Sequence, residues 1–396
     1  MQLSKQYQDI VQKIHVEQQE PEWMLKKRHA ALHYFMKEPM PNFIYGLNIN
    51  LNVDLDLEKL EIGSEKKIAR KITNTSAGIF YNKELFQKKE LEFKEHFMSS
   101  CVPMVDKFTA FHATFCDEFL LIIIPANETI EKPIEIDSVI PGGTHFDHMV
   151  IIAQKNSKAT IVEKISSFED SKSYVSKLVE VYVEDNAQLD YGNLQELNDQ
   201  SFQMTIKRAV VGRDALVNWL DCCFGSKTTL SEVTSLLNDS GAQTNNHGIF
   251  SGTGDQQFDL VNKSIHRAPN TISDIFTKGI LQQKSKCLYI GLVKIEQNAG
   301  NSNGYQKQDT LLLSPEAAAD SIPNLEIDNS EVRCTHGATI GKSDPEKLFY
   351  LQSRGLSKDI ATREYVKGFF EPLIAKMKIA ALRENMHDLL DERMGN

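Results

Sequence analysis

The 396-residue sequence contains no long apolar run, no excess of basic charge and no closely paired cysteines. Its longest apolar stretch, residues 119–125, is far shorter than the ~20 residues that a membrane-spanning helix needs. The 44 basic and 54 acidic residues give a formal net charge of −10, which is not typical of a nucleic-acid-binding protein. We therefore expect a protein that binds neither a membrane nor nucleic acid.

Cysteine is sparse, and the six cysteines are scattered without a C-x-x-C motif. The polar start of the chain, residues 1–6, does not resemble a secretory signal peptide. In a chain of this length without such a signal, the cysteines are expected to be reduced thiols. The expected location is therefore cytoplasmic.

Familiar catalytic and nucleotide-binding motifs are also missing. There is no Ser-His-Asp set, no H-E-x-x-H and no dinucleotide-binding glycine motif in a strand-helix context. The stretch 337–343 resembles a phosphate-binding loop, but the first glycine of that motif would fall at position 336, which is His336. Its side chain would crowd the backbone nest that holds phosphates. We expect no nucleotide on this chain, so any ATPase is a partner.

Residues 1–105 are expected to form an N-terminal helical and mixed domain. Pro21 suits a first helical turn, and apolar residues follow it at three- and four-residue spacing. Residues 48–58 have the pattern of an extended linker, and a further helix is expected around residues 83–95.

Residues 106–342 are expected to form the β-rich core. A fully buried strand at residues 119–124 is followed by short alternating segments. Turns with Asn, Asp or Gly before a small residue separate these segments, beginning at positions 156, 186, 214 and 240, which are 30, 28 and 26 residues apart. Short strands at a loosely fixed period, without helices between them, favour a coiling parallel β-helix. A β-sandwich gives similar spacing, but no connection of Greek-key length is present.

Residues 343–396 are expected to form a C-terminal helical domain. Ser343 to Glu346 supplies a cap, a first-turn proline and acidic residues, and Gly355 ends that helix. A second helix is expected from Ser357 to about Phe370, and Pro372 is expected to open or kink a third. These helices can close the end of the β-helix or bind a partner protein, and the pattern leaves both interpretations open.

The main candidate metal ligands are Cys334 and His336. They are two residues apart, so on a strand both side chains point to one face, where a thiolate and an imidazole can share an iron or copper ion. The alternative is a buried small hydrophobic residue beside a histidine whose polar atoms are satisfied.

Two other groups of possible ligands are weaker. His145 and His148, in a loop-like stretch, could bind a metal with Asp147, but no third ligand of the usual kind is near in sequence. Cys222 and Cys223 are adjacent on an expected strand, so their side chains should face opposite ways and not share an ion.

With the β-helix pattern and the Cys-x-His stretch both present, the chain resembles the SufB/SufD family of iron–sulfur cluster assembly proteins. The similarity covers most of residues 20–370. It lies in Glu20–Met24, Pro39–Pro41, Asn270–Ser273, Lys278–Ile280, Gly291–Ile295, Cys334–Thr339 and Leu348–Gly355, of which the last two are the most specific. The resemblance implies a right-handed parallel β-helix between helical end domains. It also implies that the C-terminal helices dock a SufC-type ABC ATPase and that β-helix edges pair two subunits.

Two positions point to the SufD-like branch of that family. SufB-type chains carry an essential cysteine where this chain has Gln308, and His-Glu where it has His336-Gly337. The strand cysteine that receives sulfur in SufB-type chains is replaced here by Val211. An amide is a poor iron ligand and cannot carry a persulfide, so this chain is expected to contribute only part of a cluster site.

The resemblance therefore implies a non-catalytic scaffold subunit that pairs with a SufB-type subunit and a SufC-type ATPase. His336 and Cys334 would hold iron or a transient iron–sulfur cluster at the subunit interface. A homodimeric scaffold with the ATPase is the nearer alternative. The remote one is a β-solenoid carbohydrate-active enzyme, which needs carboxylates gathered on one groove. Its candidates are Asp255, Asp259, Asp309 and Glu326.

Overall fold

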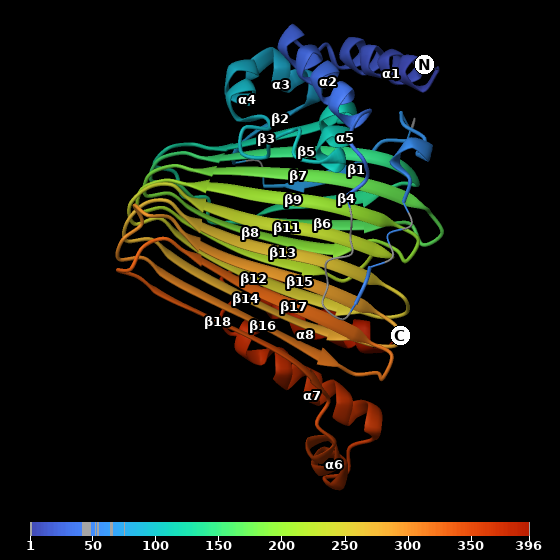
Figure 1. Cartoon of the computed structure of the whole chain (residues 1–396), viewed down its shortest axis with the longest axis vertical. Helices are drawn as coiled ribbons and strands as arrows, with labels where there is room; N and C mark the ends of the chain where they lie inside the picture. The colour runs from blue at the N-terminus through green and yellow to red at the C-terminus, as the bar shows by residue number, and fades with distance from the viewer. Residues whose placement is uncertain are drawn as a thin grey trace.

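The computed structural model is a mainly β protein in which a parallel β-helix lies between two groups of helices (Figure 1). This confirms the expected fold class. The described residues are 2–41, 49–51, 53, 55–63, 66–74 and 76–395. None of their helices is long and apolar enough to cross a membrane.

The N-terminal group packs on one end of the β-helix through a shared aromatic core. Its elements are α1 (Gln2–Gln18), α2 (Glu22–Phe35), the 3-10 turn η1 (Leu57–Lys59), α3 (Asn82–Lys88), α4 (Glu90–His96) and α5 (Lys107–Phe115). The helix expected around residues 83–95 is thus two short helices, because Lys89 between them has a non-helical φ of −139°. Inside this core Arg28 is fully buried, pairs with Glu20 and donates to the Thr114 carbonyl at 2.8 Å.

Two nine-stranded sheets form the walls of the β-helix. Sheet A contains β1 (Ala69–Thr73), β4 (Ile134–Ile140), β6 (Lys158–Ser167), β8 (Gln188–Glu196), β10 (Leu216–Cys223), β12 (Gln243–Gly252), β14 (Ile272–Leu281), β16 (Asn303–Leu312) and β18 (Arg333–Lys342). Sheet B contains β2 (Gly78–Tyr81), β3 (Glu118–Ile124), β5 (Gly143–Ala153), β7 (Ser173–Val183), β9 (Phe202–Val211), β11 (Thr228–Leu237), β13 (Gln257–His266), β15 (Lys286–Ile295) and β17 (Ala318–Ile327). All pairings are parallel except β1 with β4 and β2 with β3.

The turns predicted from the sequence form one column along an edge of the β-helix. Asn156, Asn186, Asp214 and Gly241 have φ values of 58°, 58°, 54° and 78°, and Asn270 in the following coil has a φ of 61°. Asn, Asp and Gly tolerate this left-handed conformation better than other residues do. Repeating such a residue once per coil therefore sends the chain from sheet B to sheet A at the same corner each time.

The interior of the β-helix is apolar along most of its length but also contains paired charges. Lys177 lies between Asp147 and Glu163, with its ammonium 2.8 Å from the Glu163 carboxylate. Lys207 binds Asp221 at 3.0 Å in the next part of the interior. All five side chains are buried, so each charge is offset by an ionic partner, as burial requires.

The expected linker over residues 48–58 lies partly outside the described residues. Its described part is more than a linker, because Ile49 and Leu51 are buried against Leu288 of sheet B. The backbone N–H of Ile49 donates to the Asp320 carboxylate at 3.0 Å. Burial of apolar side chains thus holds this N-terminal stretch on late strands of the β-helix.

The C-terminal helices are α6 (Pro345–Ser353), α7 (Lys358–Ile374) and α8 (Ala380–Gly395). The prediction that Pro372 opens or kinks the third helix is wrong, since Pro372 lies in the last turn of α7 and the next helix begins at Ala380. Phe370 and Leu373 on either side of the proline are buried against sheet A. This packing offsets the backbone hydrogen bond that proline cannot make.

Candidate functional site

The β-helix ends in two edge strands, β17 and β18. In the described part of the chain, each of them has a hydrogen-bonded neighbour on one side only. β18 pairs in parallel with β16, placing Cys334 beside Gly304 and His336 beside Gln306. We call β17, β18 and the inward-facing residues of β16 the open end.

Cys334 and His336 lie on the same side of β18, as the two-residue spacing predicted. Cys334 is half-buried and packs with Val293 and Ile295 of the β-helix interior. Partial burial raises the pKa of the Cys334 thiol. His336 is exposed, and no hydrogen bond joins its ring to another described residue. Its imidazole is therefore accessible at the open end.

Gln308, at the position that decides the SufD-like expectation, is buried on β16 beside Ala338. Its amide donates to the Thr310 hydroxyl, while its carbonyl oxygen has no partner among the described residues. Gln306, which is paired with His336 between strands β16 and β18, is fully buried. Neither polar atom of its side chain has a hydrogen-bond partner among the described residues. The open end thus presents unsatisfied amides next to an accessible imidazole.

A second exposed feature lies on α6, which projects from the β-helix and contains no buried residue (Figure 1). Phe349 and Tyr350 are 72 % and 57 % exposed. Between α6 and α7 is a groove whose lining includes Tyr350, Leu351, Tyr365 and Phe369. Large exposed aromatic side chains of this kind mark surfaces that bind other proteins.

The carboxylates of the remote enzyme alternative are mostly engaged in ion pairs. Asp309 binds Lys278 at 3.1 Å, and Glu326 binds Lys294 at 3.0 Å. Asp255 lies 3.9 Å from Lys227 on an exposed turn, and Asp259 is buried on β13. No described groove gathers these residues, so nothing in the geometry supports glycoside chemistry.

Comparison with known proteins agrees with this architecture. The family model described as the SufBD core domain of SUF-system FeS cluster assembly matches residues 137–369. Proteins of Staphylococcus haemolyticus and Staphylococcus aureus, each named an iron–sulfur cluster assembly SufBD family protein, are both 30 % identical to the chain over 419 aligned positions. These alignments cover 93 % of this chain and 89 % of each relative.

The chain belongs to the SufBD family. The matched region runs from β4 into α7, so it contains the open end and the α6–α7 groove. The family resemblance expected from residues 20–370 is therefore confirmed.

This SufBD protein also contains a buried cluster that the sequence did not reveal. The stretch containing His145 and His148 is strand β5, not a loop. His145 and His148 are three positions apart on this strand, so their side chains point to opposite faces of the sheet. His145 contacts the Pro141 carbonyl at 3.0 Å, and Asp147 is occupied by Lys177, so neither joins His148. The structure therefore does not bring His145, Asp147 and His148 together as a metal site.

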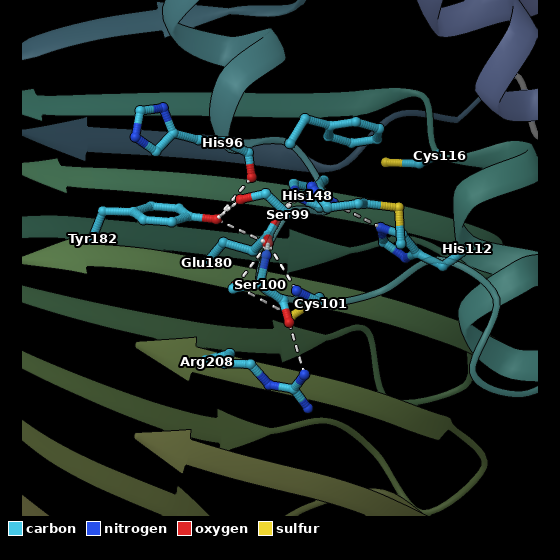
Figure 2. Close-up of polar contacts among 12 residues, drawn as sticks. His96, Ser99, Ser100, Cys101, His112, Cys116, His148, Glu180, Tyr182 and Arg208 are labelled. Carbon is cyan, nitrogen blue, oxygen red and sulfur yellow. Dashed lines mark hydrogen bonds and ion pairs between the residues drawn. The ribbon is translucent and has the colours of Figure 1, made fainter. Parts of the chain in front are cut away.

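His148 instead meets His112 of α5 and Cys116, the residue that directly follows this helix (Figure 2). His112 Nε2 is 3.2 Å from His148 Nδ1, and His112 Nδ1 is 2.9 Å from the Ser176 hydroxyl. Burial and the neighbouring His148 lower the pKa of His112 well below its usual value, and burial raises that of Cys116. All three side chains are fully buried.

Glu180 on β7 continues this chain of contacts. It accepts from His148 Nε2 at 3.0 Å, from the backbone N–H groups of Ser100 and Cys101 at 2.9 and 3.0 Å, and from the Met98 N–H (Figure 2). Burial alone would raise the pKa of Glu180, but the hydrogen bond and charge of His148 and the other donors lower it. An ionised carboxylate thus holds the 98–101 segment on sheet B.

The two cysteines at 222 and 223 follow the prediction. Both are buried on β10, and they belong to separate apolar clusters on opposite faces of sheet A. Burial raises the pKa of both thiols well above the usual value. They are packing residues.

Proposed function

We propose that this SufBD protein is a SufD-like, non-catalytic scaffold subunit that assembles iron–sulfur clusters in the cytoplasm. Gln308 and Gly337 support the SufD-like assignment, because neither supplies the thiolate or carboxylate expected of a SufB-type chain. Membership of the SufBD family supports a function in cluster assembly. The accessible His336 supports the open end as the part of this chain where the cluster is held.

The open end is the surface that we assign to subunit pairing. Within the described residues, β17 and β18 each have one edge without a neighbouring strand, and such an edge is a template for a strand of another chain. The partner in this proposal is a SufB-type subunit that supplies the missing thiolate. A second copy of this chain is the alternative, but two copies would bring two Gln308 amides and no thiolate there.

His336 and Cys334 are the proposed ligands of the iron or nascent cluster, which is the cargo of the complex. Imidazole and thiolate both bind iron, and Cys and His ligation is known in iron–sulfur centres. Cys334 must lose its proton to bind, and its raised pKa opposes this until a metal or a partner charge is present. His336 is therefore the stronger candidate.

Residues 343–396 form the proposed docking unit for a SufC-type ATPase. The exposed Phe349 and Tyr350 and the α6–α7 groove support this assignment. Because α7 and α8 are packed on sheet A, a force applied to them would reach strands that lead to the open end. Nucleotide binding and hydrolysis belong to the partner in this proposal.

The test replaces the ligands one at a time in the complex co-expressed with its partners. His336→Ala should abolish most of the iron and acid-labile sulfide that copurify, and Cys334→Ser should reduce them less. Thr335→Ala, on the same strand with its side chain toward the other face, is the matched control and should retain the wild-type content. Normal cluster content in the His336→Ala complex would rule out a ligand role for His336.

A further inference from the structure

The His112–Cys116–His148 cluster is unused by the proposed function and lies far from the open end, beside the N-terminal helices (Figures 1 and 2). One potential ligand atom from each side chain lies within 4.8 Å of the other two. α5 supplies His112, the residue that directly follows this helix is Cys116, and β5 supplies His148. The end of α5 and strand β5 thus bring two imidazoles and a thiol together, and the thiol now contacts the carbonyl oxygens of Glu118 and Phe146 at 3.6 and 3.8 Å.

The spacing of the two imidazoles fits a tetrahedral metal ion. His112 Nε2 and His148 Nδ1 are 3.2 Å apart. Two nitrogens bound to one zinc ion at about 2.0–2.1 Å with tetrahedral angles lie about 3.3 Å apart. The ion would take the place of the present nitrogen–nitrogen hydrogen bond at nearly the same nitrogen–nitrogen distance, with each ring turned so that its nitrogen points to the ion.

The outer nitrogens of both rings already have the oxygen partners that metal-binding histidines use. His148 Nε2 contacts the Glu180 carboxylate at 3.0 Å, and His112 Nδ1 contacts the Ser176 hydroxyl at 2.9 Å. In metalloproteins such contacts fix the ring orientation and raise the basicity of the inner nitrogen. Glu180 is itself fixed by backbone donors of the 98–101 segment, so this outer shell is rigid.

We propose that His112, Cys116 and His148 bind one transition-metal ion of the zinc class, which joins α5 to sheet B. A thiolate with two imidazoles selects zinc, iron or copper over magnesium or calcium, and zinc commonly binds these ligand types. Three protein ligands leave one coordination position for a small ligand.

Two proton movements accompany binding. The Cys116 thiol releases its proton to solvent and becomes the thiolate ligand. His148 keeps its Nε2 proton, which it donates to Glu180. His112 transfers its proton from Nε2 to Nδ1, where it is donated to the Ser176 oxygen. No oxidant or reductant is required.

The first experiment uses the isolated full-length chain, so it needs neither the partners nor cluster assembly. Metal analysis of the purified protein should find about one zinc per chain. Refolding with Co²⁺ as the spectroscopic probe should give tetrahedral visible bands and a thiolate-to-cobalt charge-transfer band at one equivalent. Iron or copper in place of zinc would keep the site and change the assigned metal. A wild-type chain that holds no metal as purified and gives no charge-transfer band would overturn the proposal.

Matched variants locate the site. Cys116→Ser should remove the charge-transfer band, whereas Cys101→Ser, another buried cysteine near this cluster, should retain it. His148→Gln should weaken cobalt binding at least tenfold, as loss of a ligand predicts, whereas His145→Gln on the same strand should not. Cys334→Ser separates this site from the open end and should leave cobalt binding unchanged. A band that survives Cys116→Ser but disappears in Cys334→Ser would refute the assignment.

Discussion

Replacement of Glu180 by Gln should release the 98–101 segment from sheet B. In the native protein one carboxylate oxygen accepts from the backbone N–H groups of Ser100 and Cys101, and the other accepts from Met98 N–H and His148. An amide offers one acceptor oxygen and one NH₂ group. Whichever carboxylate oxygen the NH₂ replaces, it faces at least one backbone donor.

The expected cost follows from the charge and burial of Glu180. Hydrogen bonds to a charged group contribute about 1.5–3 kcal/mol each, and removing one partner of a buried ionic pair costs about 3–5 kcal/mol. Because Gln retains part of the acceptor set, we expect a loss of about 3 kcal/mol in the free energy of local opening. At 1.4 kcal/mol per factor of ten, this is about a hundredfold loss of amide protection.

Hydrogen exchange followed by mass spectrometry measures this loss at the amides of Ser100 and Cys101. Asp185→Asn is the control, because that carboxylate pairs with Lys155 in an exposed ion pair. An exposed ion pair adds little to stability, so protection of the 98–101 segment should be unchanged in the control. Wild-type protection at these amides in Glu180→Gln would refute the role assigned to Glu180.

Three further perturbations test other parts of the structure. Burial lowers the pKa of His266 to about 4, so below pH ~6.5 the unfolded state binds a proton at this residue more strongly than the folded state does, and the protein loses stability as the pH is lowered, by up to about 3 kcal/mol near pH 4. His266→Gln should reduce this loss in urea unfolding measured across that pH range, and an unchanged pH dependence would contradict the prediction. At the left-handed turn, Asn186→Ala should lower the free energy of unfolding by about 1 kcal/mol more than Asn186→Gly does, because only alanine is strained at a φ of 58°. Equal unfolding midpoints of the two variants would refute this prediction. Phe349→Ala should reduce capture of the ATPase partner at least tenfold without changing Tm, since aromatic residues at interface hot spots contribute about 2 kcal/mol or more. The control is Leu91→Ala, at a residue of α4 that is 76 % exposed, which should leave capture unchanged. Equal capture by the two variants would show that Phe349 is not part of the docking surface.

The β-helix could be predicted because its signals are local and repeated. Turn residues such as Asn156 and Asn186 recur once per coil, and the strands between them alternate in a period of two. Helix ends were predictable where a cap decides them, as at Asp344 before α6. Pro372 was misinterpreted because packing of Phe370 and Leu373 on sheet A outweighs the local preference of proline.

The open end was predictable in part. The two-residue spacing of Cys334 and His336 correctly placed both on one face of a strand, because alternation depends only on the local backbone. Their position on an edge strand depends on how many coils precede them, and the sequence does not show that β18 ends its sheet.

The buried cluster was missed because its members come together only through tertiary structure. His148 is 36 residues from His112 and 32 from Glu180, and strand register and the docking of α5 determine their contact. One sequence signal was available, since Cys116 follows His112 by only four residues, directly after the end of α5. The expectation of a loop at His145 and His148 was wrong, because both residues lie on strand β5 and their side chains have different partners.

The composition of the assembled complex tests the central proposal most directly. This chain would be co-expressed with a SufB-type subunit and a SufC-type ATPase, and the purified complex analysed by native mass spectrometry together with its iron and acid-labile sulfide. We expect one copy of this chain for each SufB-type subunit, a bound ATPase, and cluster content that falls sharply when this chain is omitted. A homodimer of this chain that carries a full cluster without the SufB-type subunit would contradict it.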